Sequence, residues 1–447
     1  MSKNKTVIHL SDHFTTDRLL RYALPSIGMM IFTSVYSVVD GFFVSNIVGK
    51  TSFAAVNLIL PVLEILGALG YVFGTGGSAL VSKELGEGRR EEASETFSLM
   101  VCTTIVIGVF VAAVGTPLLR PILKAIGAKG AMLEEAMAYG TILMPAMIIF
   151  MLQYMFQAFF ITAEKPKLGF AITVIAGLTN MFLDWLFMAV FHWGIRGAAL
   201  ATALAQLIGG AVPIVYFARP NTAALHLGRP RFRFNKIKKA AANGASEFMT
   251  TVSLSIVSIC YNVQLIRFAG QDGVAAYGVI MYVNFIFLAV FIGYATGTAP
   301  IVGFHFGAGN KDELHGILKR SLSLIAVTGI ALTAAAEILA RPLSMIFVSY
   351  DAHLLAMTVR GFRLYSLSYL LAGFNIYGSS FFTALNNGFV SAAISFLRTL
   401  VFETSCVWLL PAFFGLTGIW FAIIVAEVLA LVVTGTFLRK NRVRYGY

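Results

Sequence analysis

Residues 76–92, GGSALVSKELGEGRREE, and residues 297–313, GTAPIVGFHFGAGNKDE, decide the fold, because they are two copies of one pattern. At a shift of 221 residues (297 minus 76), three glycines and the final glutamate of the first copy recur in the second. The same shift relates Gly49 to Gly270, Arg120-Pro121 to Arg341-Pro342, Thr162-Ala163 to Thr383-Ala384, and Gly194 to Gly415. A constant shift over this length indicates an internal duplication of the whole chain.

The composition places both copies in a membrane. The chain has 447 residues, of which 58% are hydrophobic and only 12% charged, whereas soluble domains carry about a quarter charged residues. We expect an all-α polytopic membrane protein with twelve transmembrane helices, arranged as two parallel six-helix repeats. This composition excludes a soluble enzyme, and the absence of alternating ten-residue segments excludes an outer-membrane barrel. The apolar runs lie near residues 22–46, 54–80, 96–119, 133–161, 168–191, 196–218, 242–268, 274–300, 317–339, 356–384, 388–411 and 416–437.

The duplication and the basic residues divide the chain. We expect an N-lobe at 1–218, a basic cytoplasmic linker at 219–241 and a C-lobe at 242–447. Most of the 33 Lys and Arg residues fall in both tails, the linker and the connections on the same side, which predicts that both termini are cytoplasmic. The net charge of +12 belongs to these helix ends, so no nucleic-acid partner is expected. The first twenty residues lack the pattern of a cleaved signal peptide, and the cysteines show no metal or disulfide spacing.

Polar residues recur in pairs within the apolar runs of the first half. Residues four apart share a helix face, and a face with two polar groups is expected to line a cavity rather than meet lipid. At 1.5 Å per residue, three of these positions lie roughly 26 to 28 Å from the basic residue that anchors the inner end of their helix, and therefore at one level. The three positions are Asp40, Asp184 and Thr202. The pairs are Tyr36/Asp40, Gln153/Gln157, Asn180/Asp184 and Thr202/Gln206.

Two carboxylates, an amide and a hydroxyl at one level predict a cation-binding site. Oxygen donors of these kinds can coordinate Na⁺, and two carboxylates held close together away from water repel each other, so that one is expected to hold a proton. Both sodium and a proton therefore fit. The repeat supplies an internal control, because it places Tyr261 at the position of Asp40 and Ser405 at that of Asp184. An acidic cluster in one lobe only favours function over packing.

The second half carries isolated charges of its own, which are Glu247, Arg398, Glu403 and Glu427. Arg398 and Glu403 are five residues apart, which on an α-helix directs them about 140° from each other. They are expected either to pair with neighbouring helices or to line a substrate cavity. Glu64 and Glu337 lie nearer helix ends, where they could reach water. The candidate substrate-cavity residues are Tyr36, Gln153, Gln157, Gln206, Glu247, Arg398 and Glu403.

Catalytic motifs are missing from the chain. It contains no HExxH or GxSxG sequence, and its glycine-rich loops lack the lysine and hydroxyl residue of a phosphate-binding loop. We therefore expect neither an enzyme nor an organic cofactor, and a metal site only if Na⁺ binds at Asp40, Asn180, Asp184 and Thr202.

These residues resemble the multidrug and toxic compound extrusion (MATE) family. The resemblance rests on ALP at 23–25, VDGFFVSNIVG at 39–49, the paired GxG loops, NMFLD at 180–184 and the duplication. It implies two lobes that form a V around a central cavity, and export of amphipathic, often cationic compounds by antiport against H⁺ or Na⁺. It also implies a coupling site at the positions that match the family's motif, which are Asp40, Asn180, Asp184 and Thr202, with Tyr36 beside them.

The chain departs from the family pattern in three places. Gln157 stands where the family has asparagine, Ser246-Glu247 stands where members often have proline and an uncharged residue, and the tenth helix has no acidic residue. The resemblance therefore does not extend to a C-lobe sodium site or to the substrate range.

The function expected from the sequence is multidrug efflux by a cytoplasmic-membrane antiporter. Its partners would be a small organic substrate and membrane lipid, and we expect a monomer. A flippase for a lipid-linked precursor is the alternative within transport, although it would favour a basic cavity. A polytopic membrane enzyme acting on lipids is the alternative from another class, and it would need a nucleophile or metal set near the interface.

Overall fold

The computed structural model describes residues 8–447, and the described chain is built from helices and the short connections between them. Long apolar stretches of good helix formers account for this, because a helix satisfies all its backbone hydrogen bonds within one segment in lipid. The elements are α1 (Thr16–Phe43), η1 (Val44–Val48), α2 (Lys50–Gly86), α3 (Arg90–Ala125), α4 (Gly130–Thr162), α5 (Pro166–Asp184), η2 (Trp185–Val190), α6 (Gly194–Ala218), α7 (Phe234–Gly307), α8 (Lys311–Val348), α9 (Ala352–Ser366), α10 (Tyr369–Ala384), α11 (Gly388–Ser395), η3 (Phe396–Glu403) and α12 (Thr404–Tyr445).

Glycines related by the repeat break the chain at matching places. Gly270 interrupts α7 with φ 61° and Gly415 interrupts α12 with φ 56°, while their counterparts Gly49 and Gly194 have φ 114° and 57°. Only glycine adopts such angles at little cost. With α7 and α12 divided at these glycines and α9 joined to α10, the described helices make twelve membrane-crossing runs. The predicted duplication of six helices is therefore confirmed.

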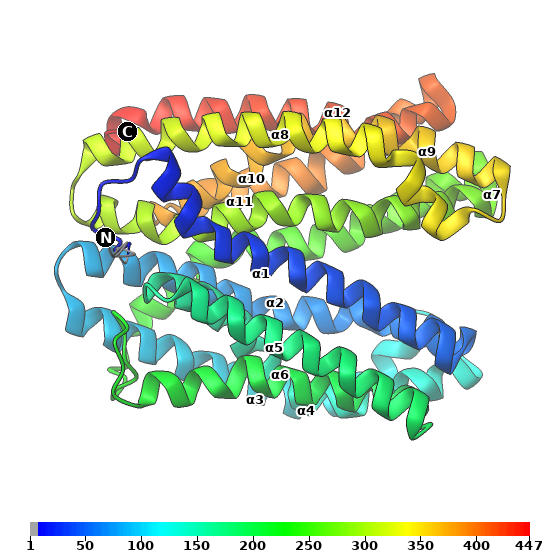
Figure 1. Ribbon diagram of the computed structural model, residues 1–447, viewed down its shortest axis with the longest axis horizontal. Coiled ribbons are helices and arrows are strands. Elements are labelled where there is room, and N and C mark those ends of the chain that lie inside the picture. The colour runs from blue at the N-terminus through cyan, green and yellow to red at the C-terminus, as the bar shows by residue number, and fades with distance from the viewer. Residues whose placement is uncertain (1–7) are drawn as a thin grey trace, which may run out of the picture.

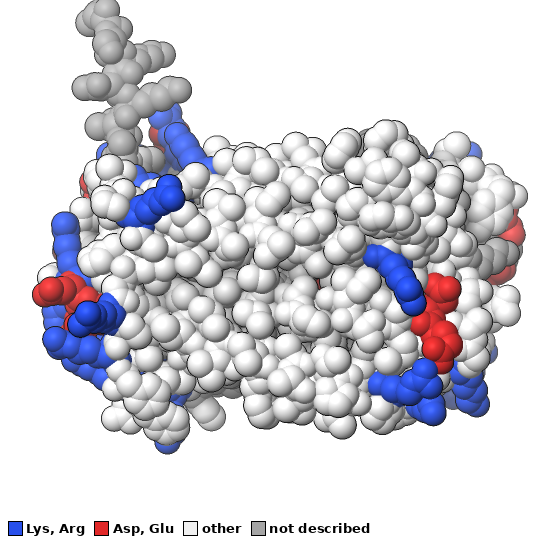
Figure 2. All heavy atoms as spheres, turned by 90° about the horizontal axis from the view of Figure 1, so that it is seen from below, with Lys and Arg blue, Asp and Glu red and all other residues white. Residues whose placement is uncertain are grey.

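The two repeats form two lobes with their helices roughly parallel to the long axis. In Figure 1, α3 to α6 lie on one side and α8 to α12 on the other, with α1, α2 and α7 between them. The beginning of the described chain and its C-terminus lie at the same end of the molecule, here named the terminal end. Figure 2 shows Lys, Arg, Asp and Glu gathered toward the two ends, with an almost uncharged band between them. Such a band is what a lipid bilayer requires.

Close backbone contacts join the lobes at the terminal end. α2 meets the two ends of α7 so tightly that a Cβ on Gly244 would lie 2.6 Å from the carbonyl carbon of Val72, and one on Gly86 would lie 2.8 Å from that of Phe304. The side-chain amide of Asn386 also donates to the carbonyl of Ala79 at 3.0 Å. Glycine permits this approach because it has no side chain. The lobes are therefore closed against each other at this end.

Two repeat-related glutamates strengthen this closure by holding the other lobe. Glu92 of the N-lobe binds Lys236 at 2.9 Å and Arg233 at 2.8 Å, at the start of α7. Glu313 of the C-lobe accepts from the backbone N–H of Phe14 at 2.8 Å and lies 2.7 Å from Nδ1 of His13, just before α1. α7 thus begins inside the range expected for the linker, because its first turn is held by Glu92.

Candidate cation and substrate sites

Asp40 of α1 and Asp184 of α5 face each other within the N-lobe. Their carboxylates are close enough for their charges to interact. α1 and α5 approach closely because Gly177 has no side chain: a Cβ there would lie 2.5 Å from the ring of Phe32 and 2.9 Å from that of Tyr36. The structure therefore brings together the two acids that the depth argument placed at one level.

Apart from the interaction of the two carboxyl groups with each other, many polar atoms of this pair and of Asn180 are buried without a hydrogen-bond partner in the described part of the chain. They comprise both carboxylate oxygens of Asp184, both amide atoms of Asn180 and Oδ1 of Asp40. Asp184 is 0% and Asn180 3% exposed. A buried polar group without a partner costs about 1–3 kcal/mol, so a cluster of five such atoms points to a ligand that supplies the missing interactions.

α4 and α6 complete the surroundings of the two acids. Tyr139 of α4 lies near Asp40, Asp184 and Thr202. The Thr202 hydroxyl donates to the carbonyl of Ala198 at 3.0 Å, and a hydroxyl oxygen that donates can still accept a hydrogen bond or coordinate a cation. Thr202 thus joins the group as expected, whereas Tyr139 was not predicted, because a tyrosine among apolar residues gives no distinctive signal.

Two π-helical segments lie directly beyond the acids. η1 (Val44–Val48) follows α1, η2 (Trp185–Val190) begins at the residue after Asp184, and the two segments contact each other. The wider π-helical turn leaves the regular α-helical hydrogen-bond ladder, and such segments are frequent at functional sites. In both helices, therefore, the irregular backbone follows the acidic residue along the chain.

The donor set fits a hard monovalent cation or a proton. All the candidate ligands offer oxygen, which suits ions such as Na⁺ rather than metals that prefer nitrogen or sulfur. Among residues 8–447, no group of three or more His, Cys, Asp or Glu side chains is arranged to hold a metal ion. Asp40, Asn180, Asp184 and Thr202 are the residues that would hold the cation.

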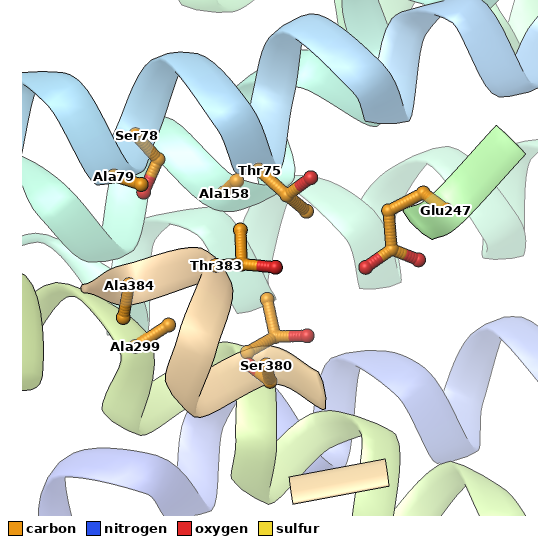
Figure 3. A pocket seen from close by; sticks show the side chains of 10 residues that line it. Thr75, Ser78, Ala79, Ala158, Glu247, Ala299, Ser380, Thr383 and Ala384 are labelled. Carbon is orange, nitrogen blue, oxygen red and sulfur yellow. The ribbon is translucent and has the colours of Figure 1, made fainter. Parts of the chain in front are cut away.

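A small cavity lies between the lobes, where Glu247 meets the hydroxyl residues of α2 and α10. It holds about 20 Å³, which is room for roughly one water molecule. Figure 3 shows the side chains of Thr75, Thr383 and Glu247 directed toward this common space. The cavity is too small for an organic substrate. It lies where the two lobes come together. Its lining residues are Thr75, Ser78, Ala79, Ala158, Glu247, Thr296, Ala299, Ser380, Thr383 and Ala384.

The predicted glutamines lie inside the N-lobe. Gln153 and Gln157 line a pocket of about 10 Å³ that Phe156, Gly169 and Gly209 also border. Gln206 is 8% exposed on α6. Side-chain amide atoms of all three glutamines lack a partner among the described residues. The structure therefore places them within the lobe, apart from the cavity that contains Glu247.

The C-lobe charges form a separate buried group. Arg398 binds Oε1 of Glu427 through Nε at 2.8 Å and through a terminal nitrogen at 2.6 Å, and Asn375 donates to Oε2 at 2.7 Å. Glu403, 6% exposed, lies near Arg398 and Tyr261. η3 (Phe396–Glu403) is π-helical, so residues five apart are neighbours there and the expected 140° separation does not apply.

Glu64 and Glu337, left open by the sequence, have different surroundings. Glu337 lies 3.6 Å from Arg363 and accepts from Ser366, near the far end of the molecule. Glu64 is exposed on α2 and accepts a hydrogen bond from Tyr154 at 3.2 Å. Its position on the face of α2 that turns toward the C-lobe was not predicted from sequence.

Fold and site together define a polytopic membrane transporter with two lobes and a buried acidic site in one of them. The MatE family model matches residues 25–186 and 234–409, and the chain belongs to this family. It is similar to "Multidrug export protein MepA" of Staphylococcus haemolyticus strain JCSC1435, with 21% identity over 426 residues, 95% of this chain and 93% of that protein. The MepA protein of Staphylococcus saprophyticus is 22% identical over 414 residues, 92% of this chain and 90% of that one.

Solved structures share the fold. "Outward-facing conformation of a multidrug resistance MATE family transporter of the MOP superfamily" aligns with a TM-score of 0.92 and 22% identity, covering 100% of this chain and 99% of that one. A MOP superfamily transporter from Pyrococcus furiosus Vc1, whose structure is described as having reversed polarity of the binding pocket, aligns with a TM-score of 0.92 and 21% identity over 100% of both chains. These likenesses establish the predicted fold, and the family is one of transporters.

Proposed function

We propose that this chain is a secondary antiporter that exports amphipathic organic cations in exchange for H⁺ or Na⁺. The observation that carries the proposal is the group of unpartnered buried oxygen atoms around Asp40, Asn180 and Asp184. A bound cation would supply the interactions that these atoms lack. The name of the MepA relatives, multidrug export proteins, supports an organic substrate.

The charge of the interlobe region supports a cationic substrate. Glu247 lies in the cavity between the lobes, and Glu64 is exposed on α2. Neither carboxylate has an ion-pair partner among the side chains that the structure describes. Unpaired carboxylates attract cations, whereas a lipid-linked pyrophosphate would need basic groups there. This distribution favours the exporter over the flippase.

The orientation follows from the basic residues. The terminal end carries Arg231, Arg233 and Lys236, and the side with the excess of Lys and Arg faces the cytoplasm in such proteins. With the termini in the cytoplasm, the contacts of Gly86 and Gly244 would close the cytoplasmic side. The protein would then be in an outward-facing state, within the cytoplasmic membrane. One chain supplies both lobes and both sites, so we propose a monomer.

Coupling would arise from competition between conformations. Cation binding at Asp40 and Asp184 would stabilise one arrangement of the N-lobe helices, and substrate binding would stabilise another. A ligand shifts such an equilibrium only by its difference in affinity between the two states. The π-helical segments η1 and η2 adjoin the acids, and their irregular hydrogen bonding is where the rearrangement would occur.

Uptake of ethidium into inverted vesicles tests this function. A proton gradient and a sodium gradient are imposed separately on vesicles that contain the wild type, Asp40→Asn or Asp184→Asn. Asp272→Asn serves as the matched control, because Asp272 is 48% exposed and lies 3.6 Å from His353, outside the acidic site. We expect gradient-driven uptake by the wild type and the control but not by the other two variants, and the effective gradient identifies the ion. Equal uptake by all four proteins would contradict the site.

A further inference from the structure

One face of α2 carries polar side chains along the interlobe side of the helix. Thr75 lies on this face, since it lines the cavity between the lobes. Tyr71 and Glu64 lie four and eleven residues earlier, and eleven residues bring an α-helix back to within about 20° of the same direction. Glu64 therefore faces the C-lobe about 16 Å farther from the terminal end.

Glu64 is exposed within the apolar helix α2, fourteen residues from its start, so the expected position near a helix end was wrong. A carboxylate that faced lipid there would be costly, because ionised groups at mid-membrane cost at least about 2.5 kcal/mol. An ion pair does not offset this cost, since Glu64 has no ion-pair partner among the described side chains. The interlobe face does avoid the cost, because on that side the carboxylate of Glu64 meets water or a substrate instead of lipid.

Aromatic rings surround this carboxylate on the N-lobe side. Tyr154 of α4 donates its hydroxyl to Glu64 at 3.2 Å. The ring of Tyr154 stacks on Tyr71 with 4.0 Å between centroids and 18° between planes, and Phe150 lies 4.5 Å from Tyr154. Tyr36 also lies close enough to interact with Glu64. A negative charge beside aromatic faces is the arrangement that binds organic ammonium groups.

The C-lobe offers a different surface at the matching positions. The repeat relates Glu64 to Phe285 and Tyr71 to Ile292, both on the second half of α7. Phe285 is 52% and Ile292 41% exposed, and Thr296 lines the same cavity as Thr75. The Ser34 hydroxyl of α1 donates to the carbonyl of Phe285 at 3.4 Å, which places Phe285 at the boundary between the lobes. One wall is therefore anionic and aromatic, and the other is apolar.

We propose that Glu64 and Tyr71 anchor the cationic group of the substrate, with Tyr154 holding both in place, while Phe285 and Ile292 hold its apolar part. This assignment rests on the proposed function and deepens it. Glu247 of the C-lobe also lies close enough to interact with Tyr71, so a second carboxylate lies within range of the bound charge. The site accordingly takes amphipathic cations and discriminates against neutral molecules of the same size by charge alone.

Equilibrium binding to the purified, detergent-solubilised protein tests the site without transport. Ethidium is the cationic probe and Nile red the neutral probe, and fluorescence reports both. The variants are Glu64→Gln, which keeps the hydrogen bond to Tyr154, and Phe285→Ala, which removes the apolar surface. Glu337→Gln is the matched control, since Glu337 lies on another membrane-crossing helix beside Arg363. Monodispersity and melting temperature verify that each variant is folded.

We expect Glu64→Gln to weaken ethidium binding about tenfold, the loss of one charge interaction, and to leave Nile red binding unchanged. Phe285→Ala is expected to weaken both probes, and Glu337→Gln neither. If the wild type binds ethidium and Glu64→Gln binds it equally tightly, the anchoring site is overturned while the proposed exporter stands. A wild type that binds no ethidium would instead overturn the proposed substrate class, and this site with it.

Discussion

Replacing Gly244 by alanine should open the terminal end of the molecule. The new Cβ would lie 2.6 Å from the carbonyl carbon of Val72, and ordinary contact requires about 3.4 Å or more, so α2 and α7 must separate by roughly 1 Å. Both partners are helix backbone, which cannot move aside as a flexible side chain does. Overpacking of this kind costs about 1–3 kcal/mol. Only the closed arrangement bears this cost, because the two helices part when the lobes separate.

A penalty of about 1–3 kcal/mol shifts the equilibrium between the closed and open arrangements about 5- to 150-fold toward the open one. Ser82 provides a reporter, since it is 0% exposed and lies against Gly303 across the lobe boundary. After the three native cysteines are replaced, Ser82→Cys is labelled with a membrane-impermeant maleimide from the terminal side. Gly244→Ala should raise the labelling rate at least fivefold.

Gly278→Ala is the matched control for this experiment. Gly278 lies in the second run of α7, beyond Gly270, and its added Cβ would meet no heavy atom within 4 Å apart from its own helix backbone. The control should leave the labelling rate at the wild-type value. An unchanged rate in Gly244→Ala, or an equal rise in Gly278→Ala, would refute the inference that glycine contacts close this end.

Three further outcomes follow from the packing and the ion pairs. Arg398→Met should lower the free energy of unfolding by about 3–5 kcal/mol, because it leaves the buried charge of Glu427 unpaired. Calorimetric or denaturant unfolding measures this loss, and a loss below about 1 kcal/mol would contradict the prediction. Glu313→Gln removes the charge that holds His13 and should raise the rate of labelling of Ser82→Cys. A labelling rate equal to that of the wild type would show that the contact between Glu313 and His13 does not help to close the terminal end. Gly177→Val should abolish cation-driven uptake without unfolding the chain, since it separates α1 from α5; retained uptake with a normal melting temperature would contradict the geometry of the site.

The duplication and the acidic site could be predicted because both depend on regular helices. A constant residue shift located Gly270 and Gly415 as the counterparts of Gly49 and Gly194, and all four have positive φ angles. The depth of Asp40 and Asp184 followed from the rise of an α-helix, and the structure places their charges within interaction range. These expectations needed no knowledge of which helices are neighbours.

The remaining features depend on contacts between helices, which residue spacing does not reveal. The partner of Arg398 is Glu427, on the next membrane-crossing run, and the π-helical turn between residues 396 and 403 changes the direction of Glu403. Gln153 and Gln157 share a helix face as expected, yet that face turns into the N-lobe. Spacing alone also does not show that Glu64 shares the helix face of Thr75, which lines the cavity between the lobes.

In the proposed mechanism, the coupling cation and the substrate compete through Asp40 and Asp184. Equilibrium binding of ethidium to the purified protein, measured as a function of pH at constant Na⁺ and of Na⁺ at constant pH, tests this competition. The wild type should bind ethidium more weakly as the concentration of the coupling cation rises, and Asp184→Asn should lose this dependence while still binding the dye. A wild-type affinity that neither H⁺ nor Na⁺ changes would rule out this competition.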